Sequence, residues 1–306
     1  MNKFEVTILG SGSALPTLKK RPTSQLVHYS NKNFLVDCGE GTQVQLRKAK
    51  VSYLKINHIF ISHLHGDHYF GLVGLISSMH LLGRVADLHI YAPKELQEII
   101  NIQLRASNTQ LRFKIHYKQL ESKESELILD DKNMQVYTIP LKHRILTNGF
   151  LFKEKPRPRK VKAEKLDFYD IPHFKIDGIK RGEDFVTKEG EIVANEKLTF
   201  PPEKARSYAF CSDTAYREKI IPIIKRVDVL YHETTFLDKD KDLAKKTFHS
   251  TAQQTGSIAK QAEVKKLLIG HFSARYTETD HPSFVAEVQS EFENVEIAEE
   301  GKSFII

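Results

Sequence analysis

Three histidines and an aspartate lie within six consecutive positions of the segment IFISHLHGDHYFG, residues 59–71. The cluster consists of His63, His65, Asp67 and His68, and it follows a short apolar segment that is typical of a β-strand. We therefore expect a tight loop at the carboxyl end of a strand, which is where α/β folds place their sites. Imidazole nitrogens and carboxylates are ligands that zinc accepts, and this close spacing allows two metal ions to share one loop. The alternative is a polar turn rich in histidine, which the partners elsewhere in the chain disfavour.

Polar side chains of the same kinds recur where other predicted strands end. The strand-like segments terminate in or just before Asp37, His63, His143, Asp213, Glu233 and His271. Side chains that bind metals would not fall repeatedly at strand ends by chance, whereas a shared site requires that placement. We therefore expect these residues to meet at one edge of the sheets.

Helices are predicted between these strands from the spacing of apolar residues and from capping signals. The predicted helices cover residues 43–49, 93–102, 220–225 and 252–262. Ser250 or Thr251 is a suitable N-cap for the last of them. Strands that alternate with helices in this way indicate an α/β fold.

Composition excludes several classes of protein. The chain has 306 residues, of which 40% are apolar, enough for a sizeable packed core. No window approaches the length of a membrane span and no signal-peptide core is evident, so we expect a soluble cytoplasmic protein with no membrane partner. Gly10-x-Gly12 is only weak evidence for a phosphate loop, and no nucleotide cofactor is expected. Cys38 and Cys211 lie in apolar runs and are expected to be buried thiols.

The net charge of +7 is unevenly distributed. Residues 153–165, KEKPRPRKVKAEK, carry seven basic and two acidic side chains, an arrangement that suits a polyanionic partner. Prolines interrupt the polar stretch that continues to residue 202, and we interpret it as an insertion. A mobile solvated loop is the alternative, but aromatic residues such as Phe168, Tyr169 and Phe174 favour a small folded arm.

With these residues in hand, the chain resembles the metallo-β-lactamase superfamily and, within it, the tRNase Z family of endonucleases. The resemblance extends over the full length and is carried by the motifs LGSGSALPT, VDCGEGTQ, SHLHGDH, PLKH, SDT, HETT, HST and HFSARY. It implies an αβ/βα four-layer sandwich over residues 1–306, with an inserted flexible arm at 153–200 that binds tRNA. His173-Phe174 stand where a typical arm of this family carries Gly-Pro.

Carried over residue by residue, the resemblance implies two zinc ions per subunit. It assigns His63, His65 and His143 to one zinc, Asp67, His68 and His271 to the other, and Asp213 to a bridge between them. Asp67 would also accept the proton of the attacking water, and His249, steered by Glu233, would protonate the leaving 3′ oxygen. Glu233 is equally suited to orienting a ligand imidazole, and Asp37 is expected to be structural or to support a ligand.

The resemblance further implies removal of the 3′ trailer from precursor tRNA, leaving a 3′-hydroxyl on the tRNA and a 5′-phosphate on the trailer. It also implies a homodimer in which the arm of one subunit holds the tRNA that is cut at the other. One alternative is another hydrolase of the superfamily that acts on small phosphodiesters or lactones. A non-catalytic nucleic-acid-binding protein is a second alternative, but every expected ligand position is filled here.

Overall fold

The computed structural model describes residues 3–306. Two compact units are distinguished in the chain. The first comprises the residues up to 129 together with 136–152 and 207–306, and the second comprises residues 130–135 and 153–206.

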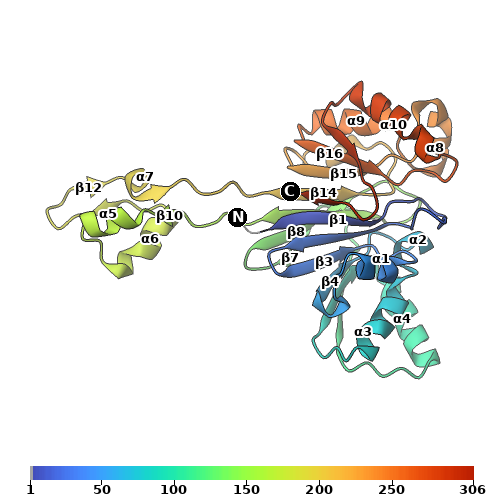
Figure 1. Ribbon diagram of the computed structural model, residues 1–306, viewed down its shortest axis with the longest axis horizontal. Helices are drawn as coiled ribbons and strands as arrows, with labels where there is room; N and C mark the ends of the chain where they lie inside the picture. Colours follow the sequence, from blue (N-terminus) through green and yellow to red (C-terminus); the bar gives the residue numbers. More distant parts are fainter. Residues whose placement is uncertain (1–2) are drawn as a thin grey trace. The chain divides into compact units, whose positions relative to one another are not determined.

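The first unit is built on two seven-stranded sheets, drawn in Figure 1. The first sheet has the order β18 (Ser303–Ile305), β1 (Phe4–Gly10), β2 (Ser24–Tyr29), β3 (Lys32–Val36), β4 (Ile56–Phe60), β5 (Leu88–Ala92) and β6 (Ile115–Gln119). The second sheet has the order β17 (Val295–Ile297), β16 (Lys266–Gly270), β15 (Val229–Glu233), β14 (Ser207–Cys211), β9 (Asn148–Glu154), β8 (Met134–Pro140) and β7 (Leu127–Asp130).

Each sheet contains a run of parallel strands. Strands β3 to β6 are parallel in the first sheet, and β14 to β17 are parallel in the second. Parallel neighbours bring their carboxyl ends to the same edge of a sheet. Asp37, Asp213 and His271 follow β3, β14 and β16, and His63 comes soon after β4. Glu233 is the last residue of β15, and His143 follows β8. The topology therefore delivers the predicted site residues to two facing edges.

Helices cover the outer faces of both sheets in Figure 1. The first sheet is covered by α1 (Thr42–Lys48), α3 (Leu72–Leu81) and α4 (Glu95–Ala106), and the second by α8 (Lys241–Thr247), α9 (Ala252–Gln261) and α10 (His281–Gln289). Leu75 of α3 and Ile59 of β4 belong to the first buried core, while Ile258 of α9 and Leu230 of β15 belong to the second. Aromatic side chains fill the space between the sheets, where the ring of Phe60 lies 5.3 Å from that of Phe150. The four layers are therefore helix, sheet, sheet and helix.

Most predicted elements are present, with small shifts at their ends. Helix α9 begins after Thr251, whose hydroxyl accepts from the Gln254 N–H in a capping box. The helix predicted at 220–225 is wrong: a 3-10 turn, Glu218–Ile220, stands there and is followed by irregular turns. Pro222 explains the error, because it lacks an N–H and disfavours helical backbone at the residue before it. Cys38 and Cys211 are buried free thiols, as predicted.

The second unit has a small core of its own. Its elements are β10 (Lys160–Val161), α5 (Ala163–Phe168), α6 (Ile176–Arg181), β11 (Phe185–Val186), β12 (Ile192–Val193), α7 (Asn195–Leu198) and β13 (Thr199–Phe200). The core is formed by Ile171, Ile179, Phe185, Val193 and Leu198. The buried Asn195 side chain donates to the carbonyl oxygens of Ile179 and Glu183, which joins α6 to the segment that follows it. At the base of the unit, the buried carboxylate of Glu154 accepts hydrogen bonds from Arg157 and Arg206.

Candidate metal centre

The backbone turns sharply where three of the strands deliver their polar residues. Asp37 after β3, Asp213 after β14 and His271 after β16 all adopt left-handed backbone, with φ of 55°, 50° and 62°. This conformation is uncommon outside glycine and is disfavoured by about 1 to 2 kcal/mol per residue. All three side chains are buried.

The first group of candidate ligands consists of His63, His65, His143 and Asp213. Nδ1 of His65 lies 3.0 Å from Nε2 of His63 and 3.2 Å from Nε2 of His143. Oδ2 of Asp213 lies 3.7 Å and 3.8 Å from the Nε2 atoms of His63 and His143. Three imidazole nitrogens and one carboxylate oxygen therefore converge on one point, with the spacing that a tetrahedral metal ion requires.

The second group consists of Asp67, His68 and His271. Oδ2 of Asp67 lies 3.4 Å from Nε2 of His68 and 3.9 Å from Nε2 of His271. The other oxygen of Asp213, Oδ1, lies 3.2 Å and 3.1 Å from those same two nitrogens. Asp213 therefore presents one oxygen to each group, which is the arrangement that a bridging ligand needs.

The state of the buried nitrogens indicates that these groups fit metal ions. Within residues 3–306, Nε2 of His68 and Nε2 of His271 are buried, and neither makes a hydrogen bond, although Oδ1 of Asp213 lies 3.2 Å and 3.1 Å away. A buried polar atom that lacks a partner is costly, and a bound cation would satisfy both nitrogens. Nitrogen and carboxylate donors in this proportion suit zinc.

A hydrogen-bonded layer behind the first loop orients its imidazoles. Oδ2 of the buried Asp37 lies 2.7 Å from Nδ1 of His68, and the Ser62 backbone N–H and hydroxyl donate to the two Asp37 oxygens. The Ser62 hydroxyl also lies 3.0 Å from Nδ1 of His63. When Nδ1 is held in this way, Nε2 is directed into the site.

The remaining imidazoles are oriented by the second half of the chain. Nδ1 of His143 donates to the Phe248 carbonyl oxygen at 3.1 Å, and Nδ1 of His271 lies 3.0 Å from the hydroxyl of Thr235. Sequence reasoning did not identify the supporting roles of Ser62, Thr235 and the Phe248 carbonyl. Ser62 and Thr235 lie inside the motifs SHLHGDH and HETT, so these motifs could have indicated that the two residues support the site.

Burial and mutual charge shift the pKa values of the clustered groups. Burial lowers the pKa of His63 and His143, which favours the neutral imidazole that binds metals. Burial also opposes charge on His68, but the carboxylates of Asp213, Asp67 and Asp37 together raise its pKa well above the ordinary value. Burial would raise the pKa of Asp213, yet the imidazoles of His271 and His68 hold it well below its usual range.

A second pair of titratable groups lies beside the two clusters. Oε1 of the fully buried Glu233 lies 2.8 Å from Nδ1 of His249, and its carboxylate also accepts from the backbone N–H of Thr214 and from the hydroxyl of Thr235. Burial disfavours charge on His249, but the Glu233 carboxylate outweighs burial and raises the imidazole pKa to about 9. His249 also reaches ligand distance from Asp213 and His271.

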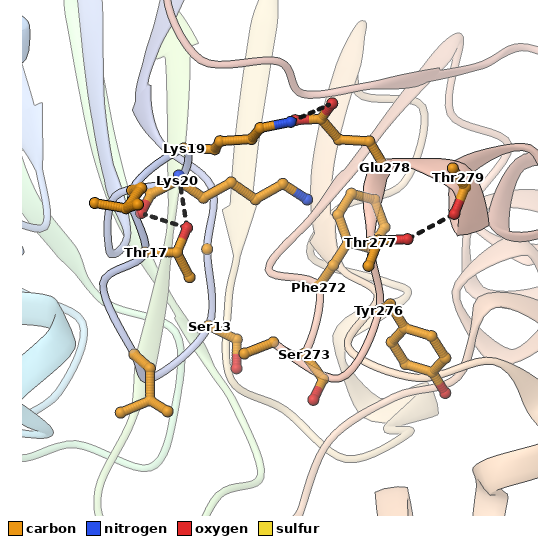
Figure 2. Close-up of a pocket in the computed structure, with 14 residues that line it drawn as sticks. Ser13, Thr17, Lys19, Lys20, Phe272, Ser273, Tyr276, Thr277, Glu278 and Thr279 are labelled. Atoms are coloured by element: carbon orange, nitrogen blue, oxygen red, sulfur yellow. Dashed lines mark hydrogen bonds and ion pairs between the residues drawn. The ribbon is translucent and has the colours of Figure 1, made fainter.

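A cavity of about 520 Å³ lies between the loop after β1 and the segment after β16. Figure 2 shows its lining, which includes Lys19, Lys20, Phe272 and Tyr276. Its walls are continuous with the metal centre, because the Ala14 N–H of the loop donates to Oδ2 of Asp67 at 2.9 Å and Phe272 directly follows His271.

The structure thus brings together every residue that the sequence nominated for the site. His63, His65, Asp67, His68, His143, Asp213 and His271 form the two groups, Glu233 and His249 lie beside them, and Asp37 lies behind His68. Their roles as ligands and catalysts remain predictions. Among residues 3–306, no helix is both long enough and apolar enough to cross a membrane.

A family model described as Anti-Pycsar protein Apyc1 matches residues 4–155. Ribonuclease Z of Bacteroides thetaiotaomicron is 52% identical over 276 residues, which cover 90% of this chain and 87% of that protein. The crystal structure of the short form of human tRNase Z is 27% identical with a TM-score of 0.70, and the match covers 98% of each chain.

The metallo-β-lactamase fold protein YhfI from Bacillus subtilis is 17% identical, with a TM-score of 0.70 and coverage of 100% of both chains. The four-layer metallo-β-lactamase fold predicted from the sequence is therefore confirmed. Identity of about half over nearly the whole length goes beyond the fold and also confirms the more specific resemblance. The chain belongs to the ribonuclease Z family.

Proposed function

We propose that this chain is an endoribonuclease that removes the 3′ trailer from precursor tRNA, leaving a 3′-hydroxyl on the tRNA and a 5′-phosphate on the trailer. The observation that carries the proposal is the pair of ligand groups that share Asp213, with the Glu233–His249 pair beside them. Family membership supports the same activity.

Two zinc ions are the proposed cofactors. His63, His65 and His143 would hold one ion, Asp67, His68 and His271 the other, and Asp213 both. When bound, such a pair supplies positive charge that lowers the pKa of a water molecule and offsets charge on a phosphodiester. The unpartnered Nε2 atoms of His68 and His271 support this assignment for the second group.

Asp67 is the proposed acceptor of the proton from the attacking water. The His68 imidazole and its neighbours hold the pKa of Asp67 below its usual range despite burial, so the group is an ionised acceptor at neutral pH. The Ala14 N–H at 2.9 Å fixes one of its oxygens. Loss of the carboxylate should therefore lower the rate of cleavage more than the affinity for tRNA.

His249 is the proposed donor of the proton that the leaving 3′ oxygen requires. A pKa of about 9 keeps this imidazole protonated at neutral pH, as a general acid must be before it reacts. Its side chain is 13% exposed, so it can be reached from solvent, whereas Glu233 is fully buried. In this proposal Glu233 keeps the proton on His249 and fixes the direction of the ring.

The arm, residues 153–200, is the proposed grip on the tRNA body. Basic side chains gather in its first part, and phosphate contacts of this kind give affinity that depends strongly on salt. Its core, formed by Ile171, Ile179, Phe185, Val193 and Leu198, supports a folded element over a loose loop. A homodimer in which the arm serves the partner's site is part of the same proposal.

A hydrolase of small phosphodiesters or lactones is the competing function. The match of residues 4–155 to a family described as Anti-Pycsar protein Apyc1 leaves almost all of the arm outside it. The arm has no evident use in turnover of a small molecule, which is why tRNA is the preferred substrate.

One experiment tests the proposal. A precursor tRNA with a trailer is incubated with zinc-loaded protein, and the ends of the products are mapped. We expect a single cut near the discriminator nucleotide and complete loss of cutting when a chelator is added. An intact precursor in the presence of metal-loaded, folded protein would show that the proposal is wrong, and turnover of a small lactone or phosphodiester by that protein would favour the competing function.

A further inference from the structure

Residues 11–21, which form most of the connection between β1 and β2, are called the loop 11–21. This loop links the metal centre to a segment close to residue 300. It forms one wall of the cavity in Figure 2. The loop contains no residue assigned to the metal centre. Four of its backbone groups nevertheless form hydrogen bonds with Glu300 or with residues of that centre.

Both ends of the loop are fixed by one carboxylate oxygen. Oε1 of Glu300 accepts from the Arg21 N–H at 2.5 Å and from the Ser11 N–H at 3.4 Å. The other oxygen of Glu300 accepts from the side-chain amide of Gln45 in α1, at 3.0 Å. Hydrogen bonds from N–H groups to an ionised carboxylate are stronger than neutral ones, so this half-buried group closes the loop firmly.

The middle of the loop and its first residue contact the site. The Ala14 N–H donates to Oδ2 of Asp67 at 2.9 Å. The Ser11 carbonyl accepts from the His271 N–H at 2.8 Å. The loop therefore bonds to the side chain of one candidate ligand, Asp67, and to the backbone of another, His271.

The loop transmits position because it is internally bonded. The Gly12 N–H donates to the Arg21 carbonyl at 2.9 Å, and the Thr17 N–H donates to the Lys20 carbonyl at 2.9 Å. Just outside the loop, a Cβ on Gly10 would lie 1.8 Å from the Pro22 carbonyl oxygen. The two chain segments that flank the loop therefore approach as closely as glycine permits. A displacement at Arg21 or Ser11 therefore moves Ala14 as well.

We propose that Glu300 is a positioning residue of this enzyme: its carboxylate fixes both ends of the loop 11–21, and the loop in turn orients Asp67 and the His271 backbone. The inference rests on the proposed function, because the orientation matters for the proton transfer assigned to Asp67. Glu300 itself does not touch the site.

The test compares Glu300→Ala and Glu300→Gln with the matched control Glu299→Ala, which removes the exposed side chain next door. E300A deletes the acceptor at the loop ends. E300Q keeps an oxygen there, and Gln45 can turn its amide to suit the new partner. Measured for each protein are the zinc content, the dissociation constant for a precursor tRNA, kcat for trailer removal, and the rate of trypsin cleavage after Lys19.

We expect E300A to bind zinc and tRNA like the wild type but to lose about tenfold or more in kcat, because misplacement of a reacting group by about 1 Å costs up to about 100-fold. Trypsin should cut E300A faster after Lys19, since the Arg21 and Ser11 N–H groups lose their bonds to Glu300. E300Q should recover most of the kcat and the resistance to trypsin, and E299A should match the wild type throughout.

Unchanged kcat in E300A, or a loss that appears only in the tRNA dissociation constant, would overturn the proposal. If E300A does not fold or does not retain zinc, E300Q is the deciding variant. A low kcat in E300Q, while its loop resists trypsin like that of the wild type, would also overturn the proposal. Failure of the proposed function is distinguishable, because in that case the wild-type protein itself leaves the precursor tRNA uncut while the difference in trypsin sensitivity persists.

Discussion

Replacement of Glu233 by Gln tests the proposed proton donor most directly. Oε1 of Glu233 lies 2.8 Å from Nδ1 of His249, and the carboxylate overcomes burial to raise the imidazole pKa to about 9. Compared with an ordinary histidine pKa near 6.5, this corresponds to about 3 kcal/mol in favour of the protonated ring. E233Q removes the charge and keeps the size of the side chain.

The sign of the pH effect follows from the direction of the shift. In the wild type, His249 loses its proton only as the pH rises through about 9, so cleavage should decline there. In E233Q burial is opposed only by the charge of Asp213, so the pKa of His249 should fall well below its value in the wild type. At the ordinary histidine pKa near 6.5, about a tenth of the molecules keep the proton at about pH 7.5. We therefore expect kcat near neutral pH to fall about tenfold or more, and to recover as the pH is lowered.

Single-turnover cleavage of an end-labelled precursor tRNA, measured from about pH 5.5 to about pH 10, checks this expectation. His249→Ala serves as the reference, since it should abolish the alkaline decline altogether. Thermal unfolding must be followed in parallel, because the amide of E233Q meets the Thr214 N–H as donor against donor and costs about 1 to 3 kcal/mol of stability. An E233Q enzyme that is folded and still declines only near pH 9 would refute the assignment of His249 as the acid.

Three further outcomes are expected. Chelation should stop cleavage and also lower the midpoint of thermal unfolding, because the buried Nε2 atoms of His68 and His271 are then left without a hydrogen bond or an ion. Re-addition of zinc should restore both the activity and the midpoint. An unchanged midpoint would contradict this expectation. Asp37→Asn should reduce zinc affinity by about 10- to 100-fold, measured by competition with a chromogenic chelator, because the imidazole of His68 loses the carboxylate that orients it. Replacement of Lys160, Lys162 and Lys165 by Ala should weaken tRNA binding and flatten its salt dependence while hydrolysis of a small phosphodiester continues; a fall in both activities would mean that the arm supports the site itself.

Much of the site could be predicted because its residues stand at fixed places in simple patterns. Short apolar segments that end in Asp37, Asp213 or His271 indicate strands, and parallel strands bring their carboxyl ends to one edge. The structure places Asp37 at this edge of the first sheet, and Asp213 and His271 at the facing edge of the second. The chemistry of the donors, imidazole and carboxylate, then predicts the kind of ion.

The supporting contacts could not be predicted, because they depend on tertiary packing between distant segments. Glu300 binds the Ser11 N–H across 289 positions, and the Phe248 carbonyl that holds His143 is 105 positions away. A backbone N–H or carbonyl carries no signature in the sequence, since every residue but proline offers both. The same reasoning explains why Ala14, a residue with no polar side chain, was not nominated.

The boundaries of the arm also depend on contacts between segments that are distant in the sequence. Its folded unit includes residues 130–135, and no pattern in the sequence joins these residues with 153–206. The connection is made by the ion pair between Asp130 and Lys155 and by the hydrogen bond from the Lys155 N–H to the Asn133 carbonyl. Neither contact follows a periodic pattern. The folded arm has a core, but it is formed by Ile171, Ile179, Phe185, Val193 and Leu198, whereas Phe168 and Phe174, which suggested it from the sequence, are exposed.

The backbone at the strand ends connects stability with the proposed activity. Asp37, Asp213 and His271 all adopt left-handed backbone, which is unfavourable by about 1 to 2 kcal/mol at each position. The sheets must therefore be stable enough to impose it, and strain of this kind is typical of functional sites. It follows that substitution of Asp213 by Gly should leave a folded and even relaxed backbone while removing the one carboxylate that faces both ligand groups, so folding and metal binding separate at this residue.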